Sequence, residues 1–447
     1  MYLYSRTAKK PVTSGPYSGA LQPRHLRMGA VALGVMLGSW MPTLAQAQVL
    51  ESLLTAALET HPATVSQRAV ISSAEASLES ARWQFFPTPS ASVESVNTSA
   101  TDPAYRGSTQ VSTLRLQQPL WTAGRLAAGT DKAEAGLNYN QAGLQEVRQQ
   151  LSGKVLQAYT EWLSAHLKTR ANEASQASHV RLREQVQRRL DEGIAAQSDV
   201  VLAQGRLDTI NADVTASKAM RDIALARLGQ LVGKPLEAPA LESALANPKA
   251  LMPNPQTVIE QALSISPTLQ KAKHFAQQQL AVVNERNADL KPEVYARLER
   301  QYGNFSYANA APESRFFVGL TSRFGAGLST ASNLQAARAQ YDAAVAEIDV
   351  QTRLVNEQVS SDLVLAQSGQ SRIASMEIAL SAVKELAESY DRQFLAGRKS
   401  WLDVMNAARE LAQTETQLAD LVSTQVLVTW RLVLNTGGVD AIAKASP

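Results

Sequence analysis

The sequence has 447 residues, of which 45% are hydrophobic and 19% charged, and it contains no cysteine. This composition excludes a chain that is disordered throughout, and the lack of cysteine excludes disulfides, zinc–thiolate sites, cysteine nucleophiles and lipid attachment to cysteine. The first 47 residues carry five basic and no acidic side chains, and the remainder has 38 basic against 40 acidic residues. The charge therefore gives no reason to expect nucleic acid as a partner.

The N-terminal segment has the pattern of a secretory signal. An apolar run over residues 28–41 follows the basic stretch, and it is shorter than the roughly 20 residues of a membrane-spanning helix. Ala45-Gln46-Ala47 then supplies a small-x-small cleavage pattern. The sequence predicts a signal peptide over residues 1–47, cleaved before Gln48, and export from the cytoplasm. An uncleaved membrane anchor is the alternative.

The rest of the sequence contains an internal duplication. Short matches recur in the same order at an offset of 203 to 205 residues, among them Gly193 with Gly397 and Asp199 with Asp403. Such a pattern indicates two copies of one structural unit. We predict a first repeat over 48–240, a Pro-rich linker over 241–255, a second repeat over 256–440 and a C-terminal tail over 441–447.

Each repeat begins with a helical stretch and ends with a long helical hairpin. The first stretches are predicted at 49–84 and 256–288. The hairpins are predicted at 123–233 and 327–435, where proline is absent and helix-forming residues are abundant. A first hairpin helix of about 65 residues would be near 100 Å long. Apolar residues seven apart in the second hairpin helices predict coiled-coil seams, although an ordinary helix face has the same spacing.

Strand patterns lie between these helices in both repeats. Apolar and polar residues alternate over about 88–98 and 109–119, and over about 292–303 and 314–324. This is typical of strands in a membrane barrel, and also of a half-buried soluble sheet. Aromatic residues gather around these segments, which favours the membrane. Because four strands cannot close a barrel, several chains would have to share one.

The signal, the duplicated order of helix, strands and long hairpin, and the repeated Gly-x5-Asp-Val motif resemble the TolC family of outer membrane factors. The resemblance covers essentially all of residues 48–440. It implies a mainly α fold with a small membrane β part: a homotrimer whose twelve-strand β-barrel continues into a long α-helical coiled-coil barrel. The function implied is an exit duct in the outer membrane, in contact with its lipid. The duct would serve type I protein secretion or multidrug efflux, together with a periplasmic adaptor (membrane fusion) protein and an inner-membrane ABC or proton-driven transporter.

The resemblance also implies a gate at the hairpin turns. The positions that match the family's tip and gate are Gly193, Ser198, Asp199, Phe394, Gly397, Lys399, Asp403 and Asn406. Asp403 matches a ring of carboxylates that could bind a cation. Phe394 stands where the family has a tyrosine and Asn406 where it has a second carboxylate, so we expect weaker cation affinity. Helix capping is the alternative role for both aspartates and both glycines.

No enzyme is predicted, and no cofactor or certain metal site. The histidines of the expected mature chain lack metal-ligand spacing, and phosphate-loop, dinucleotide and nucleophile-elbow motifs are missing. The alternative function is a periplasmic coiled-coil scaffold or adhesion protein with no channel. Many efflux members of the family are lipid-anchored through an N-terminal cysteine, so the lack of cysteine favours type I secretion or a TolC-like general role, but the sequence does not name a substrate.

Overall fold

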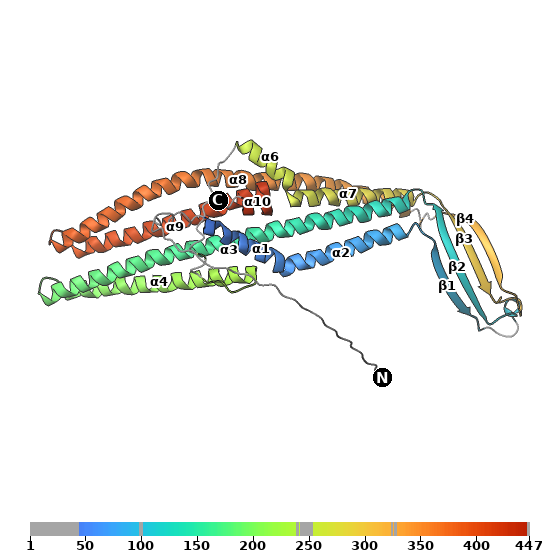
Figure 1. Cartoon of the computed structure of the whole chain (residues 1–447), viewed down its shortest axis with the longest axis horizontal. Coiled ribbons are helices and arrows are strands. Elements are labelled where there is room, and N and C mark those ends of the chain that lie inside the picture. Colours follow the sequence, from blue (N-terminus) through green and yellow to red (C-terminus); the bar gives the residue numbers. More distant parts are fainter. Residues whose placement is uncertain are drawn as a thin grey trace, which may run out of the picture. The chain divides into compact units, whose positions relative to one another are not determined.

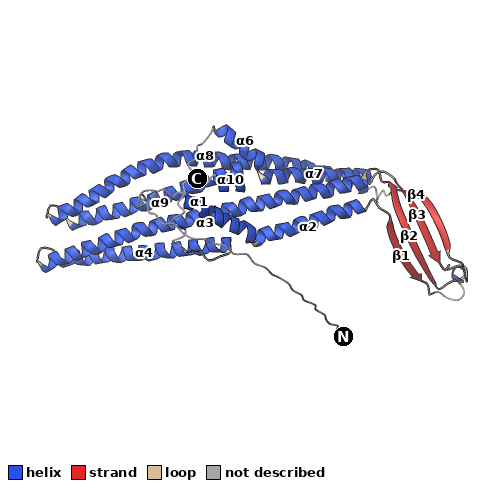
Figure 2. Ribbon diagram, in the orientation of Figure 1, coloured by secondary structure: helices blue, strands red, loops and turns tan. Residues whose placement is uncertain are grey.

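The computed structural model describes residues 44–97, 102–237, 241, 254–322, 325 and 329–444. Its elements are long helices and one small antiparallel sheet (Figures 1 and 2). The mainly α fold with a small β part is as predicted. Most of the predicted signal peptide and linker lies outside the described residues.

Apart from one short helix in the first repeat, the two repeats contain the same described elements in the same order. The first repeat has α1 (Leu44–Thr60), α2 (Pro62–Trp83), β1 (Thr88–Ser95), the short helix η1 (Pro103–Tyr105), β2 (Gln110–Trp121), α3 (Arg125–Asp191) and α4 (Gln197–Val232). The second has α6 (Pro255–Ile265), α7 (Pro267–Ala288), β3 (Glu293–Tyr302), β4 (Glu313–Thr321), α8 (Ser329–Leu395) and α9 (Trp401–Gly437), followed by α10 (Val439–Lys444). Both α3 and α8 have 67 residues, so the duplication extends to the length of the longest helix.

The helical stretch predicted at the start of each repeat consists of two helices. Pro62 and Pro267 each stand at the first position of a new helix, where a missing N–H costs nothing. His61 caps α2 by accepting the Ala63 N–H on Nδ1, and Ser266 caps α7 by accepting the Leu269 N–H on Oγ. Proline therefore redirects the chain at the same place in both repeats.

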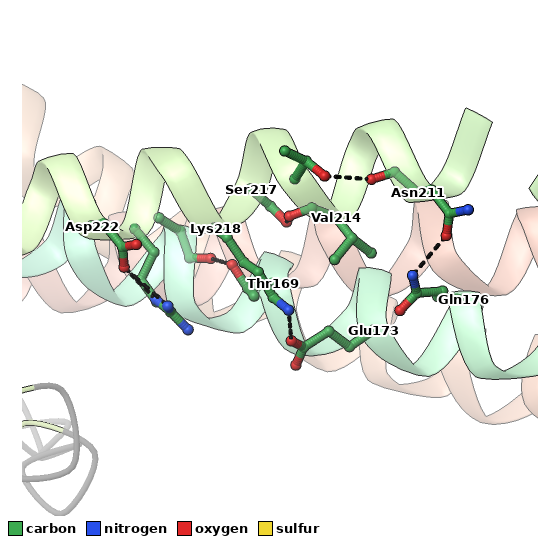
Figure 3. A network of polar contacts seen from close by, with 11 residues as sticks. Thr169, Glu173, Gln176, Asn211, Val214, Ser217, Lys218 and Asp222 are labelled. Carbon is green, nitrogen blue, oxygen red and sulfur yellow. Dashed lines mark hydrogen bonds and ion pairs between the residues drawn. The ribbon is translucent and has the colours of Figure 1, made fainter. Parts of the chain in front are cut away.

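Each long helix pairs with the helix that follows it. In the first hairpin, Gln176 of α3 donates to Asn211 Oδ1 of α4 at 2.7 Å, and Lys218 Nζ lies 2.8 Å from Glu173 Oε1 (Figure 3). The seam residues Val200, Val214 and Leu228 are buried, in agreement with the coiled-coil spacing. The two hairpins are joined along α3 and α9, which pack against each other.

The largest core lies where α1, α3, α4 and α9 meet. Trp162 of α3 and Trp430 of α9 are among its largest buried side chains. Leu241 from the predicted linker and Ile442 from the predicted tail are also buried in this core. The predicted C-terminal tail over 441–447 thus begins within α10, and residues 445–447 lie outside the described part of the chain.

A buried polar contact sets how α8 and α9 approach each other. Gln425 interrupts the apolar seam of α9, yet its side chain is buried and donates to the Ala366 carbonyl of α8 at 3.1 Å. A Cβ at Gly369 would overlap the Gln425 carboxamide. Nearby, Arg431 forms a bidentate ion pair with the fully buried Asp362. These contacts hold α8 and α9 in one register.

The four strands form one antiparallel sheet in the order β1-β2-β3-β4, so β1 and β4 are its edges. The observed bounds lie within about three residues of the predicted strands, and Phe324 of the last one lies outside the described residues. Pro89, within the edge strand β1, stands opposite Leu116 of β2. The joined register brings strands from both repeats into one sheet.

The two faces of the sheet differ in polarity. Apolar side chains on one face are well exposed in the single chain: Val93, Leu114, Leu116, Leu298, Phe316, Val318 and Leu320. The other face carries polar and charged residues, among them Arg115, Glu299 and Arg315, which stand opposite one another. Among the helices of the described part, none combines the length and the hydropathy needed to cross a membrane.

Candidate functional site

Glycine ends the first helix of each hairpin. Gly193 has φ +73° and Gly397 has φ +72°, a left-handed conformation that other residues rarely adopt. The Ile194 N–H donates to the Arg189 carbonyl at 2.8 Å, and the Arg398 N–H donates to the Gln393 carbonyl at 2.9 Å. Each glycine thus ends its helix in the way that the capping alternative describes, and the result is two matching turns, which we call the hairpin tips (192–196 and 396–400).

The aspartate that follows each glycine in the repeated motif caps the start of the second helix of its hairpin. Asp199 Oδ2 accepts the Ala196 N–H at 3.2 Å, and Asp403 Oδ2 accepts the Ser400 N–H at 3.4 Å. Each aspartate therefore stands three residues inside its helix and reaches back to the cap residue, which is half of a capping box. Only the second tip has the other half, because the Asp403 N–H donates to Ser400 Oγ at 3.2 Å.

The surroundings of Asp403 favour its charged form. The Ser400 hydroxyl donates to Asp403 Oδ2 at 2.8 Å, and Lys399 Nζ lies 3.9 Å from the same oxygen. The hydroxyl hydrogen bond, followed by the lysine charge, lowers the pKa of Asp403 below its ordinary value. Lys399 Nζ also lies 4.2 Å from the centre of the Tyr390 ring, so this lysine is held between a ring and a carboxylate.

A small apolar cluster joins the two tips. This tip core consists of Leu182 and Val186 of α3, Val200 of α4, Phe394 of α8, and Val404 and Met405 of α9. Phe394, which we expected at the gate, is only 1% exposed. It serves as the centre of this core.

Arg189 links the hairpins beside the tip core. Its guanidinium carbon lies 4.0 Å from the centre of the Phe394 ring, and Nη2 donates to the Phe394 carbonyl. A cation over an aromatic face and a charged donor on a carbonyl are both favourable contacts. The link runs from α3 to α8 and so connects the first hairpin to the second.

The remaining predicted positions lie on the surface. Ser198 and Asn406 are exposed, and Asn406 Oδ1 accepts from Arg409 at 3.4 Å. The structure thus brings Phe394 into the tip core and Lys399 to Asp403, while Ser198 and Asn406 stay outside these contacts. In the described part of the chain, no three His, Asp or Glu side chains gather closely enough to hold a metal ion.

Three residues of this site were not predicted from the sequence: Arg189, Tyr390 and Ser400. The role of Ser400 could have been predicted, since a serine three residues before an acidic residue at a helix start is a capping-box pattern. The roles of Arg189 and Tyr390 could not, because their contacts depend on how the hairpins and the turn fold together.

Comparison with known proteins identifies the family. The family described as "Outer membrane efflux protein" matches residues 53–234 and 258–437, which is most of the chain and includes both repeats. This family consists of channel proteins and not of enzymes, as the sequence predicts. The resemblance to TolC-like outer membrane factors is confirmed.

One curated relative and several solved structures are similar to this chain. The chain is 27% identical over 330 residues to the alkaline protease secretion protein AprF of Pseudomonas aeruginosa, and the match covers 69% of this chain and 66% of AprF, just under two thirds. The outer membrane protein VceC of Vibrio cholerae superposes with a TM-score of 0.75 at 18% identity, covering 89% of this chain and 98% of VceC. The Campylobacter jejuni CmeC outer membrane channel gives 0.74 at 14% identity, covering 88% of this chain and 85% of CmeC.

At these identities the solved structures show a shared fold, and the family match extends the likeness to the location of the protein. The chain belongs to the outer membrane efflux protein family and is a protein of the cell outer membrane.

Proposed function

We propose that this chain is the exit duct of a type I secretion system. Three chains would form the duct and work with a periplasmic adaptor and an inner-membrane ABC transporter. The observation that carries the proposal is the joining of a four-stranded sheet, apolar on one face and open at both edges, to long paired helices.

The sheet supports a shared, closed assembly. Its apolar face suits lipid, and an open strand edge is not stable in a bilayer. The free edge of β4 in one chain would pair with β1 of the next. Three sheets joined in this way would place the charged face around a water-filled path.

The helices support a duct that crosses the periplasm. At about 1.5 Å per residue, α3 and α8 extend roughly 100 Å from the strands to the hairpin tips. At the tips, Asp403 would form a ring of three carboxylates, with its charge maintained by Ser400 and Lys399. Such a ring favours cations at the periplasmic mouth. The tips are also where the adaptor and the transporter would dock.

The similarity to AprF favours protein export over efflux, because that relative is named for protease secretion. Efflux of small molecules with a proton-driven pump is the second candidate, favoured by the family description. Nothing found favours the scaffold or adhesion alternative.

Two measurements test the proposal. The purified protein, extracted from outer membranes with detergent, should run as a trimer and conduct ions in a planar bilayer. Deleting the chromosomal copy should remove one or more proteins from the culture medium without changing drug susceptibility. Drug sensitivity with an unchanged set of secreted proteins would instead support efflux, and a monomer without conductance would contradict the duct.

A further inference from the structure

The charged face of the sheet has an ordered arrangement across all four strands. One register row contains Ser90, Arg115, Glu299 and Arg315, each opposite its neighbour. The next row toward the helices contains Thr88, Gln117, Arg297 and Phe317. Because residues two apart on a strand share a face, these rows are about 7 Å apart. We call the two rows the arginine girdle.

Glu299 lies beneath the arginines of the girdle. Its Oε2 is 3.7 Å from Arg115 Nε and 3.4 Å from Arg297 Nε. The side chain of Glu299 is 14% exposed, whereas those of Arg115 and Arg315 are 42% and 41% exposed. The one carboxylate of the girdle is therefore sheltered, and positive charge faces outward.

Aromatic rings hold Arg297 in place. Its guanidinium carbon lies 4.5 Å from the centre of the Phe317 ring and 5.9 Å from that of Tyr295. The Tyr295 ring lies against Gly319, where a Cβ would overlap it. Phe317, an apolar residue that breaks the alternation of β4, thus contacts the Arg297 guanidinium on the charged face.

The charged residues of the described strands are concentrated on one face of the sheet. Among the charged residues of the described strands, only Arg300 shares the face of Leu114, Leu298 and Phe316. The arginines of the girdle therefore belong to the face that would line the path and not to the face that would meet lipid.

Other carboxylates of the charged face lie outside the girdle. Glu313 pairs with Arg315 in the adjoining row toward the loops, and Glu94 lies one row further in the same direction. Glu293, near the helices, pairs with Arg125. In the girdle and the adjoining Glu313 row, three arginines stand against two glutamates, which leaves one positive charge in excess over these three rows.

We propose that the arginine girdle is an anion-selective zone of the duct, which attracts the carboxylates of acidic polypeptide cargo as it leaves the cell. The inference rests on the proposed function, since only a closed assembly would repeat the girdle three times around one water-filled path. Rings of arginine or lysine favour anions in pores. The girdle would thus act with the opposite sign to the Asp403 ring at the tips.

The natural lack of cysteine allows a direct test from the outer side of the membrane. Ser90→Cys puts a single thiol into the girdle row, and no other cysteine is present. Its reaction rates with anionic sulfonatoethyl and cationic trimethylammonioethyl methanethiosulfonate are measured in intact outer membranes, each relative to a free thiol in solution. We expect the anionic reagent to be favoured, because the local potential concentrates it.

Three variants in the Ser90→Cys background test whether the charges of the girdle cause the preference for the anionic reagent. Arg115→Gln with Arg315→Gln should lower the anionic-to-cationic rate ratio roughly threefold or more, and Glu299→Gln should raise it. Arg300→Gln removes one positive charge from the apolar face, as Arg315→Gln alone does from the charged face, and should leave the ratio unchanged. If the double variant does not assemble, Arg315→Gln alone gives the same comparison on the edge strand.

The outcomes separate this inference from the proposed function. A reactive thiol at position 90 whose rate ratio ignores Arg115 and Arg315 would overturn the anion-selective girdle and leave the duct intact. A thiol that reacts with neither reagent would show that this face is not lined by water. That result would overturn the duct and the girdle together.

Discussion

Arg189 of α3 lies over the ring of Phe394 of α8 and donates a hydrogen bond to the Phe394 carbonyl. The two residues come from different repeats, 205 positions apart. This contact, with the tip core beneath it, ties the first hairpin to the second at the end where the proposed duct would narrow.

Replacing Arg189 should therefore loosen the tips. Arg189→Ala removes both the cation–π contact and the hydrogen bond, together worth about 1–3 kcal/mol. We expect a larger single-channel conductance in planar bilayers, with more frequent openings. Arg188→Ala is the matched control, because Arg188 is exposed and carries the same charge. Equal conductance in the two variants would rule out a latch at Arg189.

The proposed ring of three Asp403 carboxylates predicts that cations block the channel. Asp403→Ala should weaken the block of conductance by a trivalent cation added on the periplasmic side, since it removes three carboxylates from the mouth. Asn406→Asp adds a carboxylate about one turn further along α9 and should strengthen the block. Asp199→Ala is the control, because Asp199 makes the same backbone contact at the other tip. Block that Asp403→Ala leaves unchanged would exclude Asp403 from the pore.

Ser400 should set the pH range of this block. Its hydroxyl, with Lys399, lowers the pKa of Asp403, so the carboxylate stays charged to a lower pH than an ordinary aspartate. In Ser400→Ala the pKa should rise, and block should fade at a higher pH. Ser198→Ala, at the other tip, should leave the profile as it is. A pH profile that is the same in all three proteins would contradict the role of Ser400.

The same shift links pH to the stability of the tip. Because the folded-state pKa of Asp403 is lowered, its stabilising effect is complete above the ordinary aspartate pKa. That effect is lost as the pH falls through the lowered value. The start of α9 should therefore loosen at a lower pH in the natural protein than in Ser400→Ala. Hydrogen exchange of the first α9 amides measures this difference.

The close approach at Gly369 predicts a second stability effect. Gly369→Ala would push a methyl group into the Gln425 carboxamide, which cannot move freely because it is buried and bonded to Ala366. Overpacking of this kind costs about 1–3 kcal/mol. A methyl group at Gly205, an exposed position of α4, meets nothing, so Gly205→Ala should stabilise by up to about 1 kcal/mol through helix propensity.

Thermal unfolding followed by circular dichroism measures both changes. Gln425→Ala in the Gly369→Ala background should recover part of the loss, since it removes the group that collides. A Gly369→Ala protein that melts like Gly205→Ala would mean that the α8–α9 contact tolerates the extra methyl group.

Local signals in the sequence were enough for the order of elements. The proline-free stretches anticipate α3 and α8, and the alternation in residues 293–302 anticipates β3. Gly193 and Gly397 mark their turns, because a left-handed backbone requires glycine. These features depend on residues close together in the chain, so a single sequence displays them.

Contacts between distant residues could not be anticipated in the same way. Gln425 interrupts the apolar spacing of α9, and the sequence alone does not show that it packs against Gly369 and donates to the Ala366 carbonyl of α8. Phe394 was expected at the gate, and its burial depends on side chains from α3, α4 and α9. The pairing of Glu299 with Arg115 depends on the register between strands of different repeats.

The position of Pro89 in the edge strand β1 has a consequence for the newly made chain before it assembles with other copies. An unpartnered strand edge offers a template on which any other extended peptide can add and start an aggregate. Proline has no N–H to offer, so it interrupts the template near the start of β1. A chain that assembles into the proposed trimer would thus have a blunted edge before assembly and still pair with the correct neighbour along the rest of β1.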